Sequence, residues 1–181
     1  MSGARNREEN RQKAERLVRQ AAEQGEQIIL LQELLETKEF CQTKNFENRD
    51  LARPLSESPA VKRLSALAKE TETVIPVSFF ERYGNTAFNS VAVLDADGSV
   101  LGIYRKTHIP DGLPYAEKFY FTPGDTGFRV WNTRYGKIGV GICWDQWFPE
   151  DAKSMAFLGA VRPCSPTATA QEPTHGIHYN A

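Results

Sequence analysis

The chain has 181 residues, of which 40% are hydrophobic and 25% charged, and its formal net charge is −1. This size and composition predict one soluble domain with a sizeable core over residues 1–181. The balanced charge gives no reason to expect a nucleic-acid partner, and no apolar run is long enough to cross a membrane. Three cysteines without paired spacing, and a start without an apolar signal core, favour reduced thiols in the cytoplasm.

The first half of the chain reads as helix, strand, loop and helix. Apolar residues at helical spacing predict an amphipathic helix over residues 10–24, and the apolar run at 27–31 predicts a short strand. The mixed, polar stretch 34–53 is expected to be a loop with at most a helical turn. Ser58 and Pro59 form a cap and a first helical position, which predicts a helix to about Thr71.

The second half reads as two hairpins and a helix. A strand at 74–81 contains Pro76, which suggests an edge or an irregular position, and strands at 88–94 and 99–105 flank a turn. A long loop over 107–125 precedes strands at 128–131 and 137–142 and a helix at 149–159. Beyond it, Arg162, Pro163 and Pro166 argue against a central strand. The order predicts a mixed α/β layering with a largely antiparallel sheet covered by helices.

Three chemical groups stand at predicted strand ends. Glu33 follows the first strand, Lys106 follows the strand at 99–105, and Cys143 stands where an apolar strand turns toward a helix start. An ammonium lowers the pKa of a neighbouring thiol, and a carboxylate can accept its proton. The three groups together suggest a cysteine nucleophile for acyl transfer, with Lys106 and the backbone N–H of Trp144 as donors to an oxyanion. Glu117, in the long loop, could orient the leaving group or hold Lys106.

Each residue also has a plain structural interpretation. A single cysteine such as Cys143 is more often a small buried hydrophobe than a nucleophile. Lys106, Glu33 and Glu117 could each be a solvated charge. The pair His175 and His178 could suggest a metal, but no carboxylate or cysteine spacing supports it, and no metal is expected.

Four motifs in this order resemble the nitrilase, or carbon–nitrogen hydrolase, superfamily. They are Leu-Gln-Glu-Leu at 31–34, Tyr-Arg-Lys-Thr-His-Ile-Pro at 104–110, the segment 117–127, and Gly-Val-Gly-Ile-Cys-Trp-Asp-Gln-Trp-Phe-Pro-Glu at 139–150. Within the superfamily the sequence is most similar to the N-carbamoylputrescine amidases. The resemblance covers about residues 5–160 and leaves 161–181 as a divergent tail of a domain that looks truncated at both ends.

The resemblance implies a fold and a reaction. The expected fold is an α-β-β-α sandwich, incomplete here, without metal or organic cofactor. The expected triad is Glu33, Lys106 and Cys143, with Glu117 as an additional active-site glutamate. The implied reaction converts N-carbamoylputrescine to putrescine, CO2 and ammonia in polyamine biosynthesis, and the family implies a homo-oligomer.

The substrate and the activity of this chain are left open by the sequence. Another carbamoyl-amine, an ω-amide or a nitrile could be the substrate, or the chain could be an inactive fragment that acts as an interaction piece. A site for N-carbamoylputrescine needs an acidic or aromatic surrounding for the distal ammonium. Asp111, Tyr115 and Asp145 are the candidates for that contact.

Overall fold

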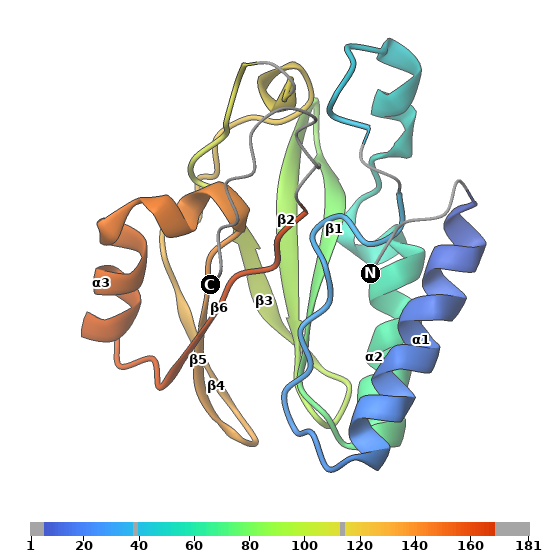
Figure 1. The fold of residues 1–181 in the computed structure, drawn as a ribbon, viewed down its shortest axis with the longest axis vertical. Coiled ribbons are helices and arrows are strands. Elements are labelled where there is room, and N and C mark those ends of the chain that lie inside the picture. The colour runs from blue at the N-terminus through green and yellow to red at the C-terminus, as the bar shows by residue number, and fades with distance from the viewer. Residues whose placement is uncertain (1–5, 38–39, 113–114, 169–181) are drawn as a thin grey trace, which may run out of the picture.

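Four layers of secondary structure make up the molecule, as a computed structural model describes it for residues 6–37, 40–112 and 115–168. Two helices cover one sheet, a second sheet packs behind the first, and a third helix covers the outer face of the second sheet (Figure 1). This is the α-β-β-α order expected from the resemblance. The helices are α1 Arg7–Glu23, α2 Pro59–Thr71 and α3 Pro149–Phe157, and the strands are β1 Ile75–Tyr83, β2 Thr86–Leu94, β3 Val100–Arg105, β4 Val130–Thr133, β5 Gly136–Val140 and β6 Arg162–Cys164.

Capping side chains set where the two outer helices begin. The Ser58 side chain accepts a hydrogen bond from the N–H of Val61, and Pro59 takes the first turn of α2, as predicted. In α1 the Asn6 side chain accepts a hydrogen bond from the N–H of Glu8, so the helix begins at Arg7 rather than at Asn10. Periodicity missed this first turn because its side chains are polar. None of the helices described here has the length and apolar character that a membrane span requires.

The first sheet is the predicted hairpin extended by one strand. β1, β2 and β3 pair antiparallel in that order, so β1 with Pro76 lies at an edge of the sheet, as its sequence predicted. Alternate residues of β2 face opposite layers. Ala92 and Leu94 pack against α1 and α2, whereas Val91 and Val93 face the second sheet.

The second sheet corrects two expectations. The strands fall into two three-stranded sheets rather than one, and the tail forms a short strand, β6, parallel to β5. Arg162 and Pro163 of β6 are exposed, and β6 is the last strand of the sheet in the part of the chain described. An edge position tolerates proline because one side of the strand needs no hydrogen-bond donor.

The predicted strand at 27–31 is wrong as a full strand. It makes a single parallel bridge, in which Ile29 N–H donates to Val74 O and Val74 N–H donates to Gln27 O. One bridge is too short to count as a strand, although the segment runs extended beside the sheet edge (Figure 1).

Close packing joins the layers of the second half. A Cβ added at Gly139 of β5 would lie 2.4 Å from the Met155 sulfur of α3, so this helix rests directly on the strand backbone. A core shared by both sheets, including Tyr104 of β3 and Ile142 beyond β5, fixes the two strand ends that follow them. The residues after β3 and after β5 therefore meet at one end of the sandwich.

Candidate active site

A buried ion cluster stands at the end of β3. Lys106 follows that strand directly and is fully buried, and its Nζ lies 3.0 Å from Glu33 Oε1 and 2.8 Å from Glu117 Oε2. Glu33 and Glu117 are 4% and 6% exposed. Buried charges need partners, so the Lys106 ammonium and the two carboxylates each depend on the others for their stability. The fold thus brings Lys106 together with Glu33, which is 73 positions away in the sequence, and with Glu117, which is 11 positions away.

Two further groups hold the Glu33 carboxylate. Asn89 of β2 donates its Nδ2–H to Glu33 Oε1 at 2.7 Å, and the backbone N–H of Ala168 donates to Oε2 at 3.0 Å. Neither was recognised in the sequence. Asn89 is fully buried within the largely apolar strand β2. A buried amide there is the signal that could have found it, because such a group needs a partner.

Cys143 occupies the predicted sharp turn. It follows β5 with a φ of 45°, opens the short 3-10 helix Cys143–Trp147, and donates its N–H to Pro166 O at 3.0 Å. A positive φ is unfavourable for a residue with a Cβ and is kept only where the surroundings enforce it. The thiol interacts with Glu33, Lys106 and Glu117, so the structure brings all four residues together.

The electrostatics of the thiol differ from the expectation. Burial and the Glu33 carboxylate raise the pKa of Cys143 to about 12, which outweighs the opposite effect of Lys106. For Lys106 itself, burial lowers the pKa, but the charges of Glu33 and Glu117 more than offset this and raise it. The resting cluster therefore pairs a neutral thiol with a charged ammonium, and the ammonium alone does not activate the cysteine.

The residues after Cys143 point in different directions. Trp144 is 42% exposed, and its N–H lies in the first turn of a 3-10 helix, where backbone N–H groups lack partners within the helix. Asp145 is fully buried, and its oxygens accept hydrogen bonds from Tyr104, His108 and Ile142. The acceptors of Asp145 already serve the protein, and its contact with substrate stays a prediction.

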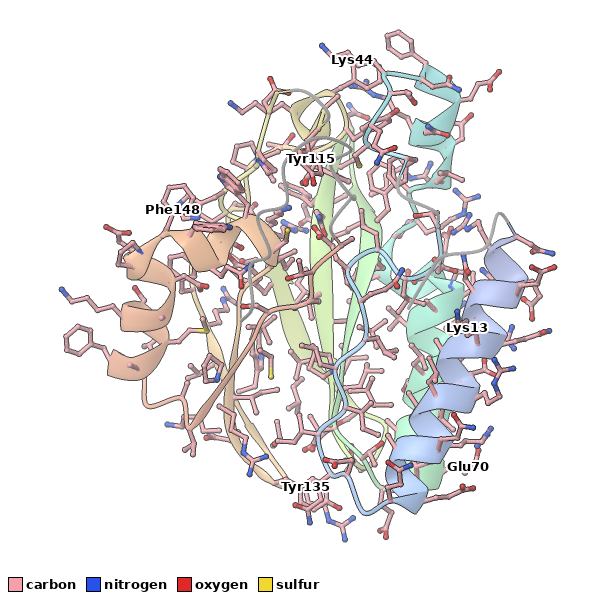
Figure 2. The ribbon with its side chains drawn as sticks, viewed as in Figure 1. Lys13, Lys44, Glu70, Tyr115, Tyr135 and Phe148 are labelled. Atoms are coloured by element: carbon pink, nitrogen blue, oxygen red, sulfur yellow. The ribbon has the colours of Figure 1, made fainter. Side chains whose placement is uncertain are left out.

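The other two substrate candidates lie in the long loop. Asp111 is exposed and Tyr115 is half-buried, with Gly112 N–H donating to Tyr115 O. Figure 2 shows Tyr115 and Phe148 toward one end of the sandwich and Tyr135 at the other. Among the residues that the structure describes, no contact places Asp111 at the ion cluster, so its role stays a prediction.

The side chains in the described part of the chain form no site that could bind a metal ion. Over residues 6–37, 40–112 and 115–168 no group of three or more His, Cys, Asp or Glu side chains could hold a metal ion. His175 and His178 lie outside the described residues.

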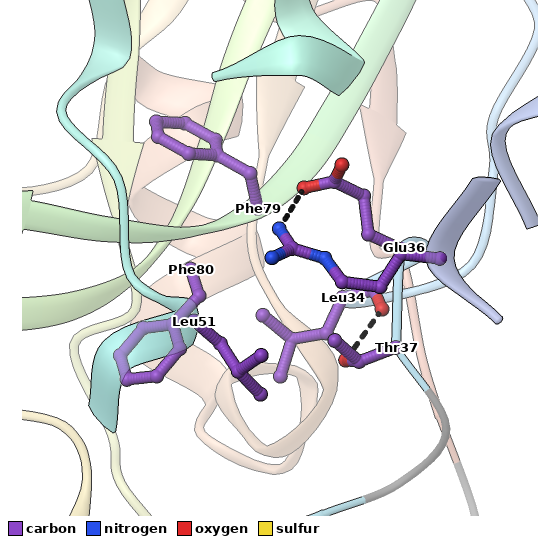
Figure 3. Close-up of a pocket in the computed structure, with 7 residues that line it drawn as sticks. Leu34, Glu36, Thr37, Leu51, Phe79 and Phe80 are labelled. Carbon is purple, nitrogen blue, oxygen red and sulfur yellow. Dashed lines mark hydrogen bonds and ion pairs between the residues drawn. The ribbon is translucent and has the colours of Figure 1, made fainter. Parts of the chain in front are cut away.

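A shallow pocket lies beside Leu34, the residue that follows Glu33. Leu34, Glu36, Phe79 and Phe80 line it together with Arg7, Thr37 and Leu51 (Figure 3). None of the cluster residues lines it. Arg7 closes one side through its ion pair with Glu36, so this pocket is separate from the thiol site.

Comparison with known proteins agrees with the geometry. The carbon–nitrogen hydrolase family matches residues 1–168. An N-carbamoylputrescine amidase from Oryza sativa is 54% identical over 165 residues, which are 91% of this chain and 55% of that protein. A citrullinase from Francisella tularensis is 53% identical over 93% of this chain and 59% of its own length.

A solved structure shows the same fold. A carbon–nitrogen hydrolase from Helicobacter pylori superposes with a TM-score of 0.91 at 37% identity, and the match covers 97% of this chain and 60% of that one. The chain thus spans a little over half the length of the relatives it matches. By its family match and its fold, the chain belongs to the carbon–nitrogen hydrolase family.

Proposed function

We propose that this protein hydrolyses a carbon–nitrogen bond of a carbamoyl-amine, with Cys143 as nucleophile. The observation that carries the proposal is the buried cluster in which the Cys143 thiol meets Glu33, Lys106 and Glu117. Nucleophile, base and oxyanion donor are the parts that acyl transfer needs. N-Carbamoylputrescine is the proposed substrate and putrescine the product, supported by the amidases of Oryza sativa and Solanum tuberosum at 54% and 58% identity.

The first half of the reaction forms a thioester-like intermediate. The Cys143 proton moves to Glu33 as the sulfur bonds to the carbamoyl carbon, and the carbonyl oxygen becomes an oxyanion. Lys106 and the Trp144 N–H stabilise that charge. Glu33 returns the proton to one nitrogen as its bond to carbon breaks, and that amine leaves.

The second half regenerates the cysteine. Glu33 takes a proton from water, whose oxygen attacks the carbamoyl carbon, and the carbon–sulfur bond breaks with the proton returning to Cys143. The carbamic acid that is released loses CO2 and yields the second amine. One water is consumed, and ammonia, CO2 and putrescine are formed. Glu117 keeps Lys106 charged and oriented throughout, since both its oxygens lie within 3.0 Å of Nζ.

The assembly and location belong to the same proposal. Apolar side chains are exposed on and after α3, Phe157 at 82% and Val161 at 74%, which supports a homo-oligomeric contact. All three cysteines are free, which supports a reducing, cytoplasmic location.

Citrulline is a second candidate substrate. The observation in its favour is the citrullinase relative, which is 53% identical over 168 residues, almost the same as the amidases. Both compounds carry the same carbamoyl-amine and differ in the distal end, where citrulline adds a carboxylate. An ω-amide and a nitrile are further candidate substrates, and their reacting groups differ more from a carbamoyl-amine.

The test is ammonia release by the purified chain from N-carbamoylputrescine and from citrulline, each beside Cys143→Ala. Cys164→Ala is the matched control, since it removes a buried thiol whose side chain packs in the core between the sheets. We expect turnover to be lost in Cys143→Ala and kept in Cys164→Ala, with mass spectrometry locating an acyl group on Cys143. Equal activity of the two variants would refute the nucleophile, and no turnover of either compound by folded protein would refute the function.

A further inference from the structure

Asp145 connects the two segments that carry Lys106 and Cys143. Its Oδ2 accepts hydrogen bonds from Tyr104 Oη at 2.7 Å and from the Ile142 N–H at 3.0 Å. Its Oδ1 lies 2.8 Å from both the His108 N–H and His108 Nδ1. Tyr104 and His108 stand two residues before and after Lys106, whereas Ile142 and Asp145 flank Cys143.

The surroundings make this connection stiff. Tyr104 and Asp145 are fully buried, so neither can exchange its partner for water. The His108 ring stacks on Phe148 with 3.6 Å between ring centroids and 5° between planes. Phe148 N–H in turn donates to Asp145 O at 2.9 Å. Each end of the carboxylate is therefore anchored on an element that is itself held in place.

The chemistry of the Asp145 carboxylate suits a brace, meaning a side chain that ties two segments together, rather than a substrate contact. An ionised carboxylate only accepts hydrogen bonds, and here four donors converge on its two oxygens. Charge-assisted bonds of this kind are short and directional. The cysteine turn, with its positive φ at Cys143, needs such an external restraint to keep its geometry.

We propose that Asp145 is a positioning residue that holds the Cys143 turn in register with the Lys106 strand end. It acts through Tyr104 and His108 on one side and Ile142 on the other. The role in catalysis rests on the proposed function, but the mechanical coupling of the two segments does not. A displacement of about 1 Å between reacting groups can cost about 10²-fold in rate, so a brace at this place sets kcat.

Asp145→Asn and Tyr104→Phe test the brace, and Asp97→Asn is the matched control. The amide keeps the shape of Asp145 but has one acceptor oxygen, so one of its two donor pairs must face an NH2 group. Tyr104→Phe removes a single hydroxyl and leaves Asp145 charged. Asp97 is an exposed aspartate in the turn between β2 and β3, away from the strand end that carries Lys106.

In turnover we expect Asp145→Asn to lower kcat about 10²-fold and Tyr104→Phe about 10-fold, with KM changed less than about twofold. The double variant should be no slower than Asp145→Asn, because both changes remove the same connection. A purely structural residue would instead lower the fraction of active protein and leave kcat per folded molecule unchanged. That result, or effects that multiply in the double variant, would overturn the proposal.

Hydrogen exchange read by mass spectrometry separates this proposal from the proposed function. Asp145→Asn should raise amide exchange in peptides spanning 103–108 and 142–147 together, with α1 unchanged and Asp97→Asn like wild type. If this occurs and the wild-type chain releases no ammonia, the function fails and the brace stands. If exchange in the two segments does not change together, the brace is refuted whatever the turnover. Should Asp145→Asn not fold, Tyr104→Phe gives the same readout.

Discussion

Asp151, near the start of α3, offers the sharpest test of the electrostatics behind the cysteine turn. The residue is 2% exposed, and its Oδ1 has no hydrogen-bond partner within the described chain. Burial and the Asp145 carboxylate raise the pKa of Asp151 from 3.8 to about 6, against the opposite effect of His108. At neutral pH the folded protein therefore contains a carboxylate whose ionised form is less favourable than it is in the unfolded chain.

The sign and size of the effect follow from proton linkage. Between pH 3.8 and about 6 the folded state binds more protons than the unfolded state, so the free energy of unfolding falls as the pH rises through this window. A shift from 3.8 to about 6 corresponds to about 3 kcal/mol. Asp151→Asn removes this cost above pH 6. For a chain of this size, that gain raises Tm by about 6–12 °C.

Urea and thermal unfolding at pH 4 and pH 8 measure the stability that Asp151→Asn gains. We expect Asp151→Asn to be more stable than wild type at pH 8, with most of that gain absent at pH 4. Glu150→Gln is the control, because it removes an exposed carboxylate from the same helical turn and should change stability by less than about 0.5 kcal/mol. A loss of stability in Asp151→Asn at pH 8, or a gain that is the same at both pH values, would refute the assignment of an uncompensated buried charge.

Further predictions concern the ion cluster. Glu33→Gln should lower kcat by about 10²–10⁴-fold and should also lower the pKa of Cys143 below about 12. The pH dependence of Cys143 alkylation measures that pKa. An unchanged alkylation profile would contradict the contact between Glu33 and Cys143. Lys106→Met leaves two buried carboxylates without their cation and should cost about 3–5 kcal/mol in urea unfolding, whereas exposed Lys118→Met should be neutral. Gly124→Ala should destabilise the protein and reduce activity together, because the new Cβ would lie 2.1 Å from a backbone oxygen next to Lys106, and wild-type behaviour would show that the loop can move away.

The sequence located the chemistry better than the layering. Lys106 and Cys143 were found because each follows an apolar strand, and the end of a strand is a position that pattern and spacing define well. The hairpin of β2 and β3 was predicted for the same reason, with its turn at 95–98. Which strands share a sheet is a matter of contacts far apart in the sequence, so the division into two sheets was not predictable from pattern alone.

The sequence also did not predict which way the side chains beyond the strand ends point. Asp145 was a candidate for contact with the distal ammonium, yet its side chain pairs with Tyr104, which stands 41 positions earlier on β3 of the first sheet. Nothing in local periodicity records that pairing. Asn89 was within reach, because a buried amide in the largely apolar strand β2 must find a partner. Similarly, Pro163 weighed against a strand only while the position was taken as central, since an edge accepts proline.

The charge balance of the cluster explains why the proton, rather than the ammonium, controls the thiol. Two carboxylates surround one ammonium, so the resting site already carries an excess negative charge, and a thiolate would add another in a buried place. When the proton passes from Cys143 to Glu33, the sulfur gains the charge that the carboxylate loses, and the net charge of the cluster stays constant. In the proposed mechanism, thiolate formation is thus tied to the moment when an electrophilic carbon is in place. The same balance favours a substrate whose reacting end is neutral, as a carbamoyl group is, because an anion at that position would meet the excess negative charge directly.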